Sequence, residues 1–148
     1  MTIPDLPDVA GYSLDGETYT IETDENRALC ESLGVAPDPE GKAHPIYYYI
    51  ATQVAMGETV AGLCNVCAFD IEDGPMMGGS NPSFNAPLMV DEPYQVRGQI
   101  DSIVRKESRK LGIMDIMTYT LHLDRLNGER MCSATNSWIF PRGQKNED

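Results

Sequence analysis

The 148-residue sequence predicts an α+β domain in which an antiparallel sheet is wrapped around one central helix. Residues 46–68 carry a single charge, Glu58, which is the profile of a buried segment. Segments of alternating apolar and polar residues at 94–104, 114–124 and 131–140 predict three long strands. The last two are joined through Asn127-Gly128, the strongest short hairpin signal. A buried helix followed by an antiparallel meander is an α+β arrangement.

Length and charge restrict the class of protein. A chain of this length can bury about 70% of its unfolded surface, so a single domain is sufficient. The 23 acidic and 11 basic residues give a net charge of -12, which argues against nucleic acid and membrane surfaces as partners. The four cysteines are too sparse for a disulfide scaffold, and the N-terminus has no signal-peptide pattern. We therefore expect a cytoplasmic protein.

The first third of the chain is expected to contain an arm, a short strand and a helix. Residues 1–17 form an N-terminal arm, because prolines and glycines interrupt any apolar period. Residues 18–21 alternate as a short strand. A helix then runs to Leu33, capped by Thr23 or Asp24 and stopped by Gly34. The folded domain is expected to span residues 18–142, and residues 143–148 form a C-terminal tail.

The central helix is expected over residues 45–56. Pro45 fits the first turn of a helix, where a missing N–H costs nothing. The three-and-four spacing of an apolar stripe is formed by Ile46, Tyr49, Ile50 and Val54. Gly57 is the expected stop, although the pattern could continue to Cys64. A membrane span is the alternative interpretation, and the polar residues Gln53 and Glu58 argue against it.

Two segments need separate interpretations. Residues 70–85 are rich in glycine and proline and predict a long, mobile loop with at most a short strand near 83–88. This segment lacks the lysine of a phosphate-binding loop. Cys64-x-x-Cys67 has the spacing of half a zinc site or of a redox pair. Because no second pair of ligands accompanies it, we expect two buried cysteines and no metal.

Several strings, in their order along residues 20–142, resemble those of MaoC-like (R)-specific enoyl-thioester hydratases and fatty-acid-synthase-type dehydratases, which have the hot-dog fold. The strings are residues 25–34, Ala43-His44-Pro45, Asn85-Ala86-Pro87-Leu88 with residues 91–96, and Asn127-Gly128-Glu129. The resemblance implies a single hot-dog domain that dimerises through its sheet edge. It also implies a substrate carried as a thioester of coenzyme A or of acyl carrier protein, with no further cofactor.

The sequence departs from this family where its active members carry an aspartate and a histidine in a Gly-Asp-x-Asn-Pro-x-His stretch. Here the corresponding stretch is shortened, and it offers only Asp38 and His44 without the Asn-Pro. The chain resembles the non-catalytic half of family heterodimers and two-domain members. That resemblance implies a partner, either a second copy or a second hot-dog subunit that bears the catalytic pair.

Asp38 and His44 are the candidate catalytic residues, as a general base and acid near the N-terminus of the central helix. The alternative is a loop aspartate and a helix-capping histidine. Tyr47 and Tyr48 are candidates for substrate binding, because the three consecutive tyrosines cannot all face the core. The alternative is that these tyrosines belong only to the core or an interface.

A basic run stands out against the acidic composition. Arg105, Lys106, Arg109 and Lys110 lie within six positions of one strand connection. Such side chains match the phosphates of coenzyme A or an acidic carrier protein. The alternative is a solvated hairpin tip that protects a sheet edge.

The sequence therefore predicts a hydratase or dehydratase subunit that completes the site of a dyad-bearing partner. The alternatives are a hot-dog acyl-CoA thioesterase and a non-catalytic subunit that binds or scaffolds acyl thioesters.

Overall fold

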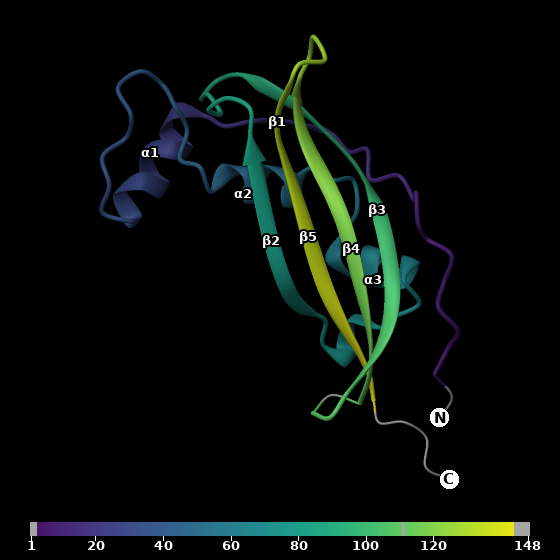
Figure 1. Cartoon of the computed structure of the whole chain (residues 1–148). Coiled ribbons are helices and arrows are strands. Elements are labelled where there is room, and N and C mark those ends of the chain that lie inside the picture. Colours follow the sequence, from purple (N-terminus) through teal and green to yellow (C-terminus); the bar gives the residue numbers. More distant parts are fainter. Residues whose placement is uncertain (1–2, 111, 144–148) are drawn as a thin grey trace.

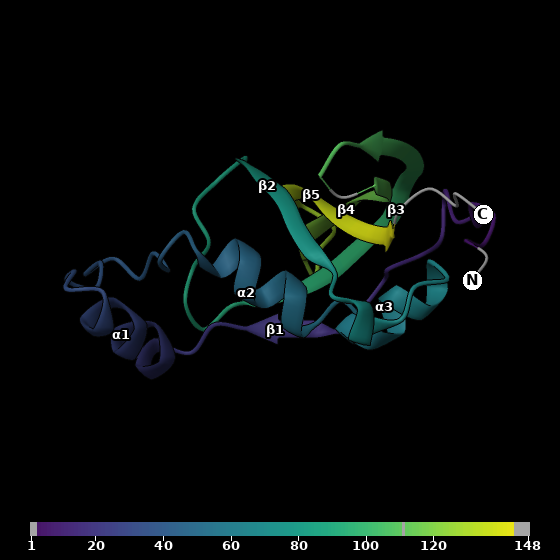
Figure 2. The same cartoon turned by 90° about the horizontal axis from the view of Figure 1, so that it is seen from below.

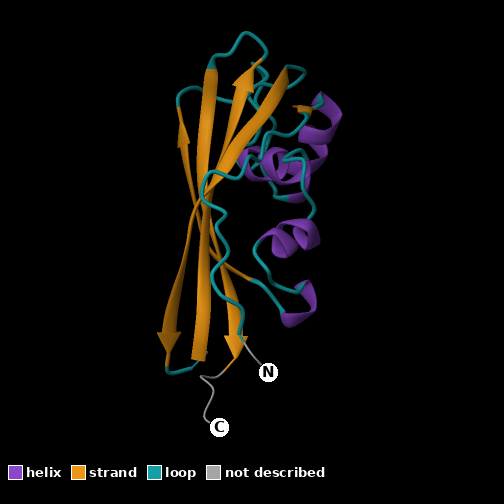
Figure 3. Ribbon diagram, turned by 90° about the vertical axis from the view of Figure 1, so that its right-hand side faces the viewer, coloured by secondary structure: helices purple, strands orange, loops and turns teal. Residues whose placement is uncertain are grey.

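The computed structural model describes residues 3–110 and 112–143 and has one five-stranded antiparallel sheet with its helices on one face (Figure 1, Figure 3). The elements are β1 (Thr18–Thr20), α1 (Thr23–Ser32), α2 (Tyr47–Val54), α3 (Val60–Val66), a 3-10 turn (Ile71–Asp73), β2 (Met76–Phe84), β3 (Pro93–Ser108), β4 (Gly112–Arg125) and β5 (Arg130–Gly143). The strand order is β1-β3-β4-β5-β2. The predicted α+β class is confirmed. The last five residues of the predicted C-terminal tail lie outside the described residues.

The three predicted long strands are confirmed as β3, β4 and β5. Along β4, Met117, Tyr119 and Leu121 are buried toward the helices, as period-2 alternation requires. A bulge in β3 between Ile100 and Ser102 ends the predicted alternation there, so that Val104 is exposed. The β4–β5 turn has Gly128 at φ +94°, which a glycine adopts without strain.

The predicted central helix is confirmed as α2, but the predicted stripe was the wrong face. The residues buried against the sheet are Tyr47, Ala51 and Ala55, whereas Val54 is 69% exposed and Ile46 is also exposed. The small side chains of the two alanines let the helix approach the sheet closely. Gly57 stops the helix at φ +82°, and α3 follows as a separate helix.

The predicted long loop at 70–85 was wrong for most of its length, because residues 76–84 form strand β2. It pairs with β5 from Met76 opposite Ile139 to Phe84 opposite Cys132. An edge strand tolerates Pro82, since one side of the strand needs no N–H donors. Gly78 leaves room for the facing strand, since a Cβ atom there would lie 2.8 Å from the Ser137 hydroxyl, which would have to move. Glycine and proline therefore mark an edge strand here.

The predicted helix at 23–33 is confirmed as α1, but its cap is not the expected one. Neither Thr23 nor Asp24 is the N-cap, and Glu22, at that position, makes no side-chain capping bond. Instead the distant Asp91 accepts a hydrogen bond from the Thr23 backbone N–H at 3.1 Å and another from the Thr23 hydroxyl at 2.5 Å. Figure 2 shows α1 at one end of the molecule, with α2 and α3 following along the sheet.

The N-terminal arm runs along the edge of β3. Backbone N–H groups of Gly11, Leu14 and Gly16 donate to carbonyls of β3 at 2.8–2.9 Å. Val9 and Leu14 are buried in the common core. The arm therefore extends the sheet beyond the three residues of β1.

A buried ion-pair network fastens the other end of the sheet. Asp115 on β4 has a fully buried side chain, and its carboxylate accepts bonds from Arg105 on β3 and Arg142 on β5 at 2.7–3.0 Å. Arg142 also donates to the carbonyls of Cys67 and Ala68 after α3. Burial alone would raise the pKa of Asp115, but the two arginines outweigh it and hold this pKa below its usual value.

Replacing Asp115 with asparagine should strongly destabilise the fold, because it leaves two arginines without a counter-charge. The expected loss is on the order of 3–5 kcal/mol in the free energy of unfolding, measured by urea denaturation. The matched change Glu107→Gln, at an exposed acid of β3, should cost no more than about 0.5 kcal/mol.

The same variant gives a pH test. Because the folded pKa of Asp115 is depressed, its stabilisation is present above the unfolded pKa of about 3.9 and is lost as the pH falls through the folded value. The difference between wild type and Asp115→Asn should therefore shrink below about pH 4. Equal stability at pH 7 would contradict the structural role of the network.

Candidate functional site

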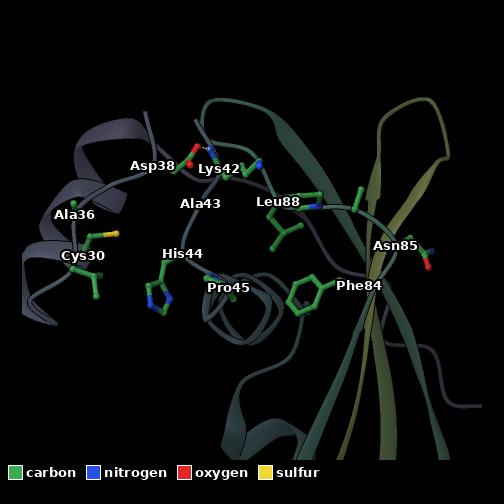
Figure 4. Close-up of a pocket in the computed structure, with 13 residues that line it drawn as sticks. Cys30, Ala36, Asp38, Lys42, Ala43, His44, Pro45, Phe84, Asn85 and Leu88 are labelled. Atoms are coloured by element: carbon green, nitrogen blue, oxygen red, sulfur yellow. Dashed lines mark hydrogen bonds between the residues drawn. The ribbon is translucent and has the colours of Figure 1, made fainter. Parts of the chain in front are cut away.

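A pocket of about 650 Å³ lies between α1 and the N-terminus of α2 on one side and the end of β2 on the other (Figure 4). Its walls come from Cys30 of α1, the loop at 35–45, and Phe84 with the link that follows it. Most of the lining is apolar, including Val35, Ala43 and Leu88. This shape and lining are typical of a site for a small organic ligand.

Backbone pairing between two loops holds the pocket together. Lys42 and Met89 form an isolated antiparallel bridge, and the Ala43 N–H donates to the Leu88 carbonyl at 2.7 Å. The buried side chain of Asn26 in α1 accepts a bond from the His44 backbone N–H at 2.9 Å. The loop that carries Asp38 and His44 is thereby fixed to both α1 and the β2–β3 connection.

Asp38 lines the pocket but is engaged in its own turn. Its Oδ2 accepts backbone N–H bonds from Glu40 at 2.9 Å and Lys42 at 3.1 Å. Figure 4 shows the Asp38 carboxylate directed toward Lys42 and the His44 ring pointing away from it. The structure therefore brings the two predicted catalytic residues to one pocket without joining them in a hydrogen-bonded pair.

His44 presents its imidazole to the pocket. The ring lies between Cys30 and Pro45 in Figure 4, and the residue is partly buried. Its Nδ1 accepts the backbone N–H of Ile46, the residue that precedes α2, at 3.1 Å. His44 thus holds the chain just before α2, whose N-cap has no side-chain capping bond, and its other ring nitrogen has no hydrogen-bond partner among the described residues.

The two predicted substrate-binding tyrosines have different surroundings. Tyr47 is 1% exposed, and burial, together with the nearby Glu25 carboxylate, raises its pKa to about 12. Tyr48 packs edge-on against Phe84 of the pocket wall, with ring centroids 6.1 Å apart. Tyr48 therefore touches the wall of the pocket, whereas Tyr47 belongs to the core.

Sequence analysis missed a polar chain that starts at Tyr48. Its hydroxyl lies 2.9 Å from the Ser80 hydroxyl on β2, and Ser80 donates to Asn136 Oδ1 on β5 at 2.6 Å. Asn136 is buried, and its Nδ2 has no hydrogen-bond partner among the described residues. The signal available in the sequence was an asparagine at an inward-facing position of β5, between Ala134 and Trp138.

The predicted basic run is not near the pocket. Arg105 is occupied by Asp115, and Lys106, Arg109 and Lys110 are exposed at the β3–β4 turn. This turn lies at the opposite end of the sheet from α1 and the end of β2 (Figure 1). The end of β2 is level with Val96, ten residues before Lys106 along β3, so the pocket and the basic run are roughly 30 Å apart or more at about 3.3 Å per residue.

The cysteines and the helices complete the survey of the predicted features. Cys64 and Cys67 are both fully buried, as predicted, and burial raises the pKa of each thiol. Within residues 3–110 and 112–143, no three His, Cys, Asp or Glu side chains are grouped so that they could hold a metal ion. In the same ranges no helix is long and apolar enough to cross a membrane.

Comparison with known proteins places the fold. No protein-family model and no curated protein sequence matches the chain. A chain of the ChsH1-ChsH2 complex from Mycobacterium tuberculosis is 11% identical with a TM-score of 0.71, covering 92% of this chain and 88% of that one. A chain of the HadBC (3R-hydroxyacyl-ACP dehydratase) complex from the same organism is 12% identical with a TM-score of 0.68, covering 89% and 97%.

A third solved structure is a MaoC-like dehydratase from Rhodospirillum rubrum, 16% identical with a TM-score of 0.63, covering 92% of this chain and 94% of that one. At such identities the likeness establishes the fold. The chain is a hot-dog domain. This is the fold that the resemblance implied.

Replacing Ser80 with alanine should destabilise the domain, because the buried Asn136 Oδ1 then loses the hydrogen bond that Ser80 donates. The expected cost is about 1–3 kcal/mol in the free energy of unfolding. Ser83→Ala on the same strand is the control, since Ser83 is exposed and should tolerate the change within about 0.5 kcal/mol. Thermal or urea unfolding measures the stability of both variants. Equal losses would show that the polar chain does not stabilise the pairing of β2.

Proposed function

We propose that the chain is a MaoC-like hot-dog subunit that binds an acyl thioester and completes the active site of an enoyl-thioester hydratase or dehydratase. The observation that carries the proposal is the pocket beside α2, which is lined mostly by apolar residues and contains Asp38 and His44 without a hydrogen-bonded pair between them. Such a pocket can bind the acyl end of a thioester. A second hot-dog subunit then supplies the catalytic pair, as the heteromeric relatives suggest by analogy of fold.

The surface on which the partner would dock is the β2 side of the molecule. Strand β2 is the last strand of the sheet, and its outer edge has no partner strand within residues 3–110 and 112–143. Met76, Met77 and Phe84 on this strand are exposed, as are Ile46 and Val54 on the neighbouring α2. An unpaired edge flanked by exposed apolar side chains favours addition of a second sheet. The pocket wall at Phe84 would then lie at the subunit interface.

The activity test compares the isolated chain with the complex that it forms in its source cells. Hydration of crotonyl-CoA adds the hydroxyl to the β-carbon and a proton to the α-carbon, and the loss of the conjugated thioester is followed by ultraviolet absorbance. The isolated chain should show little or no hydration, because Asp38 and His44 do not form a pair. The complex with a second hot-dog subunit should restore turnover.

Other results of the same assay would indicate a different functional class for this chain. Robust hydration by the isolated chain that Asp38→Asn or His44→Ala abolishes would return the catalytic pair to this subunit. Release of free coenzyme A thiol from acyl-CoA would indicate a thioesterase. Thioester binding without either reaction, in the chain and in the complex, would indicate a scaffolding subunit.

Measuring the binding of coenzyme A to variants distinguishes two candidate sites for its phosphates. Lys42 is the basic residue that lines the pocket, while the predicted basic run lies at the other end of the sheet. Lys42→Ala should weaken coenzyme A binding about tenfold in titration calorimetry, the effect of one charge-assisted contact of roughly 1.5 kcal/mol. The exposed pair Arg109→Ala/Lys110→Ala is the matched comparison and preserves the Arg105–Asp115 ion pair. A larger loss of coenzyme A affinity in the Arg109→Ala/Lys110→Ala variant would indicate that the basic run is the phosphate site.

A further inference from the structure

We propose that His44 is a positioning residue that donates a hydrogen bond from Nε2–H to the carbonyl oxygen of the bound acyl thioester. This inference rests on the proposed function and assigns a specific role within it. The alternative assignment for the same side chain is the general base or acid of a catalytic pair, and the two roles require different protonation of the ring.

The hydrogen bond at Nδ1 fixes the state of the ring. A backbone N–H can only donate, so the contact from Ile46 at 3.1 Å requires an unprotonated Nδ1. A neutral imidazole with a bare Nδ1 carries its proton on Nε2. His44 therefore offers a donor on its free side. A general base would instead need a bare nitrogen facing the substrate.

The imidazole is also held in place before any ligand arrives. The His44 backbone N–H donates to Asn26 Oδ1 at 2.9 Å, and the ring Nδ1 accepts the N–H of Ile46 just before α2. No described carboxylate accepts a bond from the ring, because Asp38 is committed to the N–H groups of Glu40 and Lys42. A ring that is fixed but lacks a carboxylate partner is suited to orienting a ligand.

The other polar groups of the pocket are already used or lie at its margin. Asn85 Nδ2 donates to the Arg130 carbonyl at 3.1 Å, and Asp38 can only accept. The Cys30 thiol lies 3.8 Å from Asn26 Oδ1, and Lys42 is exposed. The His44 Nε2–H is thus the neutral donor offered to a ligand among the apolar lining residues. A carbonyl oxygen, which has two lone pairs and no proton, is its natural complement.

The test compares two ligands that differ only at the carbonyl: hexanoyl-CoA, a thioester, and hexyl-CoA, the thioether without the carbonyl oxygen. Titration calorimetry of the full chain should show wild type preferring the thioester by about 2- to 12-fold, the factor contributed by one neutral hydrogen bond. His44→Ala should bring this ratio close to one. His44→Gln places an amide donor near the position of Nε2 and should keep most of the preference.

Two further results separate this inference from its alternatives. Lys42→Ala should weaken the binding of both ligands by the same factor, because both carry the same phosphates. The ratio of the two affinities should therefore stay unchanged. In the active complex, His44→Gln should retain turnover of crotonyl-CoA and raise KM at most, whereas a general base would lose kcat on this change.

The failures are distinguishable. Equal affinity of wild type for both ligands, or loss of the preference in His44→Gln, would overturn the role of His44 while leaving the acyl-thioester pocket in place. Absence of binding by either ligand, for wild type and for the complex, would overturn the proposed function and this inference with it. Circular dichroism of each variant checks that the fold is retained.

Discussion

The structure depends on covering the apolar inner face of the β3–β4–β5 meander. Each of these strands turns large side chains inward, among them Tyr94, Tyr119 and Phe140, and they form one continuous core. Helix α2 is only eight residues long, so it reaches this face through Ala51 and Ala55 and cannot cover all of it. The N-terminal arm and α3 complete the cover, and the outward side of α2 keeps its apolar residues. The apolar surface beside β2, where we propose that a partner docks, is therefore a consequence of how the core is covered.

The fold could be predicted from the sequence where the pattern is long and local. The meander was predictable because each strand is at least 14 residues long and alternates inward and outward over much of that length, in β3 as far as the bulge after Ile100. Strand β2 was missed, because an edge strand buries too little to need alternation and tolerates Gly78 and Pro82. The face of α2 was missed for a related reason. Alanines give a weak hydrophobic signal but allow the closest approach to a sheet.

The candidate site was predictable in part. Asp38 and His44 were singled out because they are the aspartate and the histidine in the stretch that corresponds to the family motif, and both line the pocket. Their lack of pairing depends on hydrogen bonds to backbone N–H groups, which no residue pattern reveals. The charge run misled for the opposite reason. Arg105 looked free beside its exposed neighbours, but its counter-ion Asp115 is brought opposite by the β3–β4 register. A linear charge count cannot separate structural cations from free ones.

The N-terminal arm has a consequence for stoichiometry. It pairs with residues 96–100 of β3, so among the described residues β2 is the long strand whose outer edge has no partner strand. A building block with one open side adds one neighbour and then stops, whereas a block with two open sides can grow into a filament. If the partner docks at β2 as proposed, a short segment without regular secondary structure of its own would thus favour a closed pair over sheet-to-sheet growth.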